Sequence, residues 1–346
     1  MSLYLPILKT AWRTAVRERR LWGFALFAGL LIGSGFGTAV VQVTGVDPTR
    51  SVLPSILDLN VGSLSRIGPL WSQAVATGTG AVAALSALGV VILALLLAIL
   101  WFAVIGANAL VLAGEHVARA TAIPRDLRQR AQARFWPTFT IHLIAKVVTI
   151  ALITAWGSVL TTTAFAATPR ATVRGIIAFV VTATLLTVIH IATPYAIAGA
   201  TLDRRGALSA LREALVLLRD RWLISVEASL LLTAANFLSI AAWAAGSLVL
   251  ALPFLFLGGI AIANGTSAML TVAIIAGIAV LVAYLVLIAM VFTTFLTMAW
   301  TLLYLRLTSE GEEPEAWTTR VVARRGKSEA RNSKFETNPN DRMTKF

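Results

Sequence analysis

Long uncharged stretches alternate along the chain with short amphipathic segments. The clearest amphipathic segment is residues 203–222, in which large apolar side chains recur every three or four residues while most polar side chains fall on the opposite side or along its border. The apolar positions are Leu208, Leu211, Leu215, Leu218 and Trp222, and the polar ones are Arg205, Ser209, Arg212, Glu213, Arg219 and Asp220. This pattern predicts a helix at a membrane interface, with Trp222 at headgroup level.

The same junction of basic helix, arginine-aromatic corner and apolar stretch occurs twice upstream. A helix expected over 1–20 leads into Arg20, Leu21 and Trp22, and a basic helix over 125–134 leads into Phe135 and Trp136. The three copies suggest an internal repeat. The alternative is that arginine and tryptophan anchor membrane helices at the interface in general, without any repeat.

The apolar stretches predict an all-α polytopic membrane bundle. Hydrophobic residues make up 58% of the chain and charged residues 13%, and the mean hydropathy is +0.82. About 20 apolar helical residues cross the roughly 30 Å of bilayer hydrocarbon. Six spans are expected within a domain of residues 1–306, at about 21–43, 76–112, 135–165, 175–201, 222–252 and 268–305.

The sequences of the segments between and after the spans also predict their structure. Residues 44–73 predict an external loop with a short helix near 52–59, and 168–174 predict a short external turn. Residues 253–267 are uncharged and apolar, so we expect them in the outer interface or against the bundle. The tail at 307–346 is rich in charged and small polar residues and is expected to be disordered.

Orientation follows from the lysine and arginine residues of the connections. The N-terminal segment and the second and fourth connections hold five each, the first and third hold two each, the fifth holds none, and the tail from Arg306 holds nine. Both termini are therefore expected in the cytoplasm, in a plasma membrane such as the bacterial inner membrane. The basic segments are expected to attract anionic lipid headgroups, at about 1 kcal/mol per basic residue.

The sequence lacks the residues that several kinds of chemistry require. The chain has no cysteine, so a disulfide, a thiolate metal site and a cysteine nucleophile are excluded. No glycine-rich phosphate loop followed by lysine occurs, and there is no HExxH pattern. Glu115 and His116 are adjacent and point to different helix faces, so the pair does not indicate a metal site. We expect no cofactor and no metal. The net charge of +13 follows the membrane topology, so no nucleic-acid partner is expected.

Polar residues within the apolar spans are the candidate site, because each is costly in a membrane unless it is paired or hydrated. The candidates are Asn108, Glu115, His142, Lys146, His190 and Glu227. His142 and Lys146 share a helix face, and a pair between Lys146 and Glu227 would neutralise both charges. The group would line a cytoplasm-open cavity for a proton, an ion or a lipid headgroup. The alternative is a buried ion pair with helix-bridging hydrogen bonds, or a Lys146 that reaches the interface.

These features favour a non-enzymatic membrane component that organises lipid or a partner protein, with a second copy of the chain among the candidate partners. The first alternative is a small transporter or permease that uses His142, Lys146, His190 and Glu227. Broken helices at matching positions of two halves would favour it, but Pro194 and Pro253 do not correspond. An intramembrane lipid-modifying enzyme, with Glu227 and a histidine as the acid-base pair, ranks last.

The layout resembles uncharacterised six-span bacterial membrane proteins and is similar to the glycerophosphoryl diester phosphodiesterase membrane-domain and YciC-like groups. The resemblance rests on the start at Trp12 and 20–23, the end of the second span at 107–110, the corner at 134–136, and the segment 207–222. It covers about residues 1–306. It implies a membrane domain and no reaction, since the catalytic domain of the phosphodiesterase is a separate soluble barrel that nothing here matches. No catalytic residue is carried over.

Overall fold

Long helices dominate the structure. A computed structural model of the chain describes residues 4–32, 72, 75–76, 78–166 and 168–309. These residues are almost wholly helical, and no strand occurs among them, which confirms the all-α prediction for this part of the chain. Five helices are long and apolar enough to cross a membrane, as expected of a multi-pass membrane protein. They are α6 (Thr79–Ala118), α8 (Phe135–Ala166), α9 (Pro169–Leu202), α11 (Trp222–Ala263) and α12 (Ser267–Thr308).

The first predicted span is described only in its first half. Helix α2 (Trp22–Ile32) begins at the predicted corner, and residues 33–43 lie outside the described residues. The predicted loop at 44–73, with its short helix at 52–59, lies outside them almost entirely. The predicted disordered tail lies outside them beyond residue 309.

Two long helices extend past their predicted ends. Helix α11 continues through Pro253 to Ala263, past the predicted end of the fifth span at residue 252. The facing helix supports this extension, because Gly277 leaves room for the side chain of Phe254. Helix α9 already begins at Pro169, where a short turn was expected, because the Thr168 side chain accepts a 3.3 Å hydrogen bond from the backbone N–H of Ala171.

The five long helices and α2 pair as three hairpins, α2 with α6, α8 with α9, and α11 with α12. Three shorter helices, which we call the collar helices, precede the hairpins: α1 (Tyr4–Arg17), α7 (Leu127–Gln132) and α10 (Ala207–Asp220). Each collar helix packs on the second helix of another hairpin: α7 on α6, α10 on α9, and α1 on α12. The contact of α1 with α12 joins the start of the described chain to its end, and so closes the ring.

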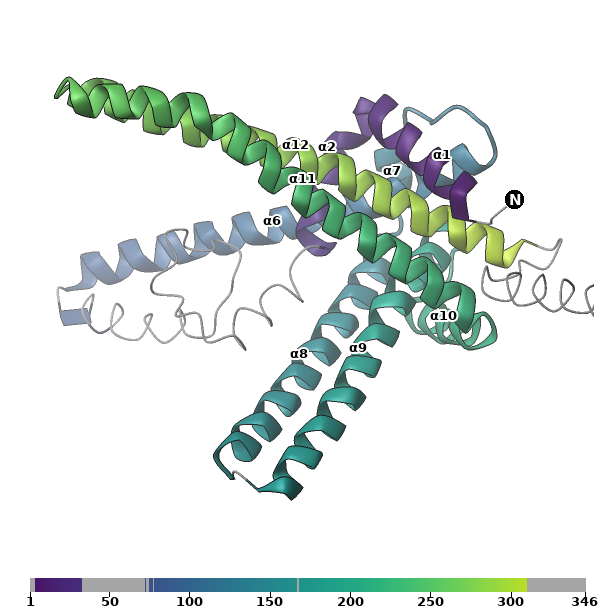
Figure 1. Cartoon of the computed structure of the whole chain (residues 1–346). Helices are drawn as coiled ribbons and strands as arrows, with labels where there is room; N and C mark the ends of the chain where they lie inside the picture. Colours follow the sequence, from purple (N-terminus) through teal and green to yellow (C-terminus); the bar gives the residue numbers. More distant parts are fainter. Residues whose placement is uncertain (1–3, 33–71, 73–74, 77, 167, 310–346) are drawn as a thin grey trace, which may run out of the picture.

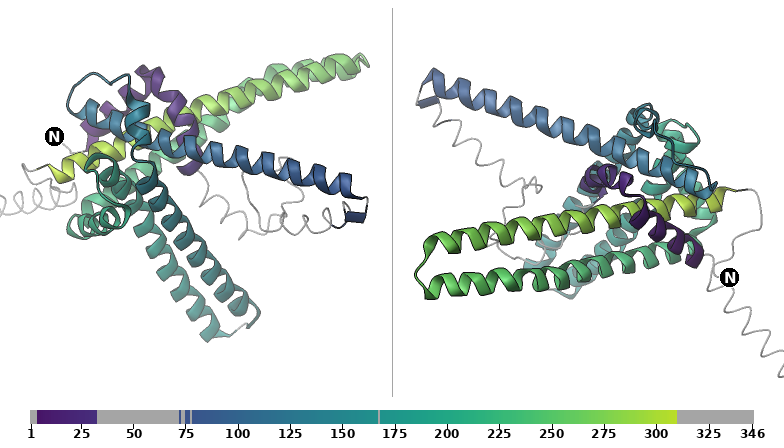
Figure 2. Two further views of the ribbon diagram at one scale, coloured as in Figure 1. Left: turned by 180° about the vertical axis from the view of Figure 1, so that it is seen from behind. Right: turned by 90° about the horizontal axis from the view of Figure 1, so that it is seen from above.

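The second helices of the hairpins, α6, α9 and α12, also contact one another at the centre of this ring. The fully buried residues of the long helices concentrate there, as in 103–111 of α6 and 195–201 of α9. Beyond the ring α6, the α8/α9 hairpin and the α11/α12 hairpin diverge as separate arms (Figure 1). The view from above shows α6 and the α11/α12 hairpin extending toward the same side of the molecule while spreading away from each other (Figure 2). The arms expose large apolar side chains, as expected of surfaces that meet lipid.

Two collar helices share one burial pattern. Each residue of α1 corresponds to the residue 203 positions later in α10, so that Ala11 corresponds to Ala214. Buried positions coincide at Ile7 with Ala210, Ala11 with Ala214 and Ala15 with Leu218. Exposed positions coincide at Leu5 with Leu208, Lys9 with Arg212 and Trp12 with Leu215. The match in burial and the cyclic packing favour the repeat over independent interfacial anchoring.

Candidate functional site

The six polar candidates occupy several different surroundings. Glu115 lies near the end of α6 and forms an ion pair with Arg119 one turn later, at 2.7 Å. His190 is exposed on α9, away from the buried end of that helix. Glu115 therefore belongs to a local helix-end pair, whose contribution to stability is at most about 1 kcal/mol.

Asn108 is the centre of a buried hydrogen-bond network. Its side chain is fully buried where α6, α7, α8 and α9 meet. Its Nδ2 donates to the carbonyl oxygen of Ala131 at 3.1 Å, and its Oδ1 accepts from the hydroxyls of Thr138 at 2.7 Å and Thr201 at 3.1 Å. These bonds use both lone pairs of Oδ1, so Asn108 joins one collar helix and three long helices.

A second buried hydrogen bond occupies the next junction of the ring. The Tyr195 hydroxyl on α9 donates to Oγ of Ser225 on α11 at 3.1 Å, and that Oγ donates to the carbonyl oxygen of Arg221 at 3.0 Å. Thr138 follows the corner Trp136 by two residues, and Ser225 follows the corner Trp222 by three. In both cases a hydroxyl at the start of a hairpin bonds to the second helix of the hairpin before it.

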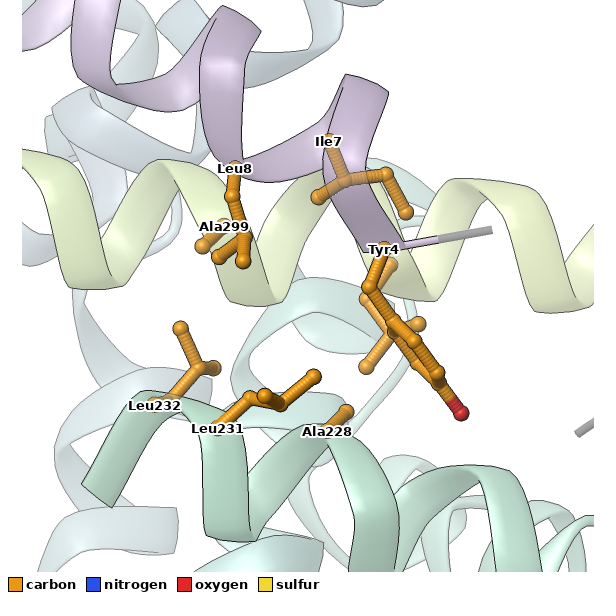
Figure 3. A pocket seen from close by; sticks show the side chains of 8 residues that line it. Tyr4, Ile7, Leu8, Ala228, Leu231, Leu232 and Ala299 are labelled. Carbon is orange, nitrogen blue, oxygen red and sulfur yellow. The ribbon is translucent and has the colours of Figure 1, made fainter. Parts of the chain in front are cut away.

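Glu227 lies at the third junction, where the ring closes. Its Oε2 accepts a 2.6 Å hydrogen bond from the hydroxyl of Tyr4 on α1. Nearby, Trp12 meets the rings of Phe292 and Phe295 edge to face, at centroid distances of 5.7 and 5.8 Å. Tyr4 also borders a shallow cleft between α1, α11 and α12 whose other lining residues are Ile7, Leu8, Ala228, Leu231, Leu232, Ala299 and Leu303 (Figure 3). This lining is largely apolar and includes none of the six polar candidates.

His142 and Lys146 lie on one face of α8, as the sequence predicts. Nε2 of His142 is buried and has no hydrogen-bond partner among the described residues. Lys146 is half-buried one turn further along the helix. The predicted ion pair between Lys146 and Glu227 stays a prediction. Asn108 and Glu227 form hydrogen bonds between helices, and Glu115 forms an ion pair at the end of its own helix, so these three candidates have separate partners.

Sequence reasoning missed a network at the end of α9. The Tyr304 hydroxyl on α12 donates to Oδ2 of Asp203 at 2.6 Å, and Arg205 lies 3.7 Å from the same oxygen and pairs with Glu213 of α10. Gly199 lets this tyrosine approach, since a Cβ there would come within 3.2 Å of its hydroxyl. The only sequence signal was a tyrosine and an aspartate at the ends of two spans.

The apolar side chains of the collar helices α1 and α10 divide between a packed face and an outward face. Small side chains make much of the packed face, as with Ala11 and Ala15 in α1 and Ala210 and Ala214 in α10. Part of the predicted apolar face of α10 is buried, including Leu218, but Leu208 remains 73% exposed. The outward apolar stripes consist of Leu5 and Val16 on α1, beside the half-exposed Trp12 whose ring also contacts α12, and of Leu208, Leu215 and Trp222 at α10. Exposed basic residues, including Lys9, Arg13, Arg212 and Arg219, adjoin the stripes.

No cluster of three or more histidine or acidic residues that would suit a metal ion occurs in the part of the chain that the structure describes. Comparisons with known protein families, with curated proteins and with solved structures found no match. The resemblance to the phosphodiesterase membrane-domain and YciC-like groups stays a prediction.

Proposed function

We propose that the protein is a non-enzymatic membrane scaffold whose collar helices lie in the cytoplasmic leaflet and organise lipid, or a partner protein, around the three hairpins. The observation that carries the proposal is that α1 and α10 each have a packed face and an outward apolar face. Each helix packs through small side chains and turns a stripe of large apolar side chains outward, next to basic residues. A stripe of this kind beside basic side chains is the pattern of a helix that enters the headgroup region of an anionic leaflet.

The absence of cysteine makes a direct test simple. Single cysteines in place of Leu208 and Leu215 would carry an environment-sensitive fluorophore, in protein reconstituted into vesicles of phosphatidylcholine and phosphatidylglycerol. The matched control is Ser209→Cys, since Ser209 is exposed on the polar side of the same helix. We expect spin-labelled lipid to quench the probes at 208 and 215 strongly and the probe at 209 weakly. Equal, weak quenching at all three positions would show that α10 lies in water, and the proposal would fail.

A small transporter is the second candidate, and one observation favours it. Nε2 of His142 is buried without a hydrogen-bond partner among the described residues, one turn from Lys146. Buried polar atoms without partners are uncommon and often mark a functional position. Uptake of protons or small cations into vesicles that contain the protein, abolished by His142→Leu and retained by His190→Leu, would support transport over the scaffold function.

A further inference from the structure

Arg128 of collar helix α7 lies against two aromatic rings of α6. Its guanidinium carbon is 5.9 Å from the ring centroid of Trp101 and 5.7 Å from that of Phe102. The two rings meet edge to face at 4.9 Å, and Phe102 also contacts Phe27 of α2 at 5.3 Å. A cation within about 6 Å of a ring is attracted by the charge distribution of the ring. The rings therefore hold Arg128 at a defined height along α6.

Arg128 lies beside α6 at the boundary between an exposed and a buried part of that helix. On one side, residues 90–97 expose large apolar side chains, and on the other, residues 103–111 are fully buried within the ring of collar and hairpins. Arg128 and Trp101 lie where the exposed apolar surface ends. Arginine and tryptophan are the residues enriched at the level of lipid headgroups. If the arms lie in the bilayer, as proposed above, Arg128 is at the depth of the lipid phosphates.

The carboxylate that is nearest to Arg128 along α7, that of Asp126, is engaged elsewhere. Asp126 accepts a 2.8 Å hydrogen bond from Nε of Arg130, and this bond lowers the pKa of the Asp126 carboxyl below its ordinary value. Among the described residues Arg128 makes no ion pair, and its side chain is exposed. A contact with a ring uses the charge of a guanidinium but leaves N–H donors available, and their planar fork matches the oxygens of a phosphate.

We infer that Arg128, held by Trp101 and Phe102, is a binding site for the phosphate of a phospholipid headgroup, with the rings against the glycerol and the upper acyl chains. This inference rests on the proposed placement of the collar in the leaflet. It goes further because it assigns one arginine among many to a specific contact. General attraction of anionic lipid would instead be shared by all the exposed arginines of the collar.

The test compares lipid retention by two single variants of the full chain. Detergent-purified protein is titrated with phosphatidylglycerol, and bound lipid is counted by native mass spectrometry. We expect Arg128→Gln to weaken binding of the most tightly held lipid about tenfold and Arg125→Gln, which removes an exposed arginine three residues away, to change it less than twofold. Equal losses in the two variants would show that binding follows net charge, and the site would be refuted.

Two further measurements identify the source of the phosphate, and two further variants control for misfolding. Diacylglycerol, which lacks the phosphate, is expected not to bind at this site, and inorganic phosphate at millimolar concentration is expected not to displace the lipid. Displacement by inorganic phosphate would overturn the lipid assignment. Should Arg128→Gln fail to fold, Arg128→Lys and Trp101→Leu replace it, and unchanged lipid retention in both would refute the site. The fluorophore on α10 reports separately on the scaffold proposal, so the two can fail independently.

Discussion

The hydroxyl of Thr138 donates a 2.7 Å hydrogen bond to Oδ1 of Asn108, and this buried pair joins the first hairpin to the start of the second. The two residues are 30 positions apart, on either side of collar helix α7. Because the same oxygen accepts from Thr201, loss of Asn108 removes the acceptor of two buried hydroxyls, while the carbonyl oxygen of Ala131 loses one donor but still accepts from the backbone N–H of Arg134. The pair is therefore a structural junction, and substitutions there should first affect stability.

We expect Asn108→Ala to lower the free energy of unfolding by about 2–4 kcal/mol, since each buried group left unpaired costs about 1–3 kcal/mol and relaxation recovers part of it. Thr138→Ala should cost about 1 kcal/mol. The control is Thr184→Ala, because the exposed Thr184 hydroxyl bonds only to the carbonyl oxygen of Val180 in its own helix. Unfolding in mixed micelles measures all three variants. Equal stability of Asn108→Ala and Thr184→Ala would contradict the network.

Two glycines of α6 give a matched test of hairpin packing. A Cβ on Gly106 would overlap the carbonyl oxygen of Phe24 in α2, whereas a Cβ on Gly89 would meet nothing within 4 Å. Gly106→Ala should therefore destabilise by about 1–3 kcal/mol through overpacking. Gly89→Ala should be neutral or stabilise by up to about 1 kcal/mol, because alanine is the better helix former. Thermal unfolding distinguishes them, and a Gly106→Ala variant as stable as wild type would argue against the α2/α6 contact.

Closure of the ring can be tested by cross-linking. In a chain without native cysteines, Trp12→Cys combined with Phe295→Cys should cross-link efficiently with a short bismaleimide, since the two rings are 5.8 Å apart. Trp12→Cys combined with Leu248→Cys is the control pair, because Leu248 lies on the exposed arm of α11. Gel mobility after labelling in membranes reports the yield. Similar yields for both pairs would mean that α1 does not rest on α12.

The bond between Tyr304 and Asp203 should show measurable coupling. In a double-mutant cycle of Tyr304→Phe and Asp203→Asn, we expect a coupling energy of about 0.5–1.5 kcal/mol. This is lower than for a fully buried charged bond, because the Asp203 side chain is 39% exposed and partly screened by water. Unfolding free energies of the wild type, the two single variants and the double variant complete the cycle. Additive effects, with no coupling, would show that the 2.6 Å contact contributes nothing.

Much of the fold could be predicted from the sequence, because local and periodic signals suffice for it. The starts of α8 and α11 coincide with the predicted corners at Phe135 and Trp222. Helix ends were harder to predict. Pro253 indicates a stop when only the local chain is considered, yet α11 continues because the facing helix accommodates it at Gly277.

The site was only partly predictable. Asn108 and Glu227 were singled out because a polar group is costly in an apolar span. The sequence could not indicate that Asn108 bonds to Thr138 and Glu227 to Tyr4. Tyr304 and Asp203 lie 101 positions apart and carry no pattern that links them.

The sequence by itself determined the helical class, the apolar stretches and the basic segments, since hydropathy and charge are properties of the chain read locally. Tertiary structure alone decided which face of each collar helix is packed. In α10 the predicted apolar face included Leu208 and Leu215, but close packing against α9 selected the small Ala210 and Ala214 and left the leucines outside. The physical reason is that helices approach most closely through small side chains, so the largest apolar residues remain for the surroundings.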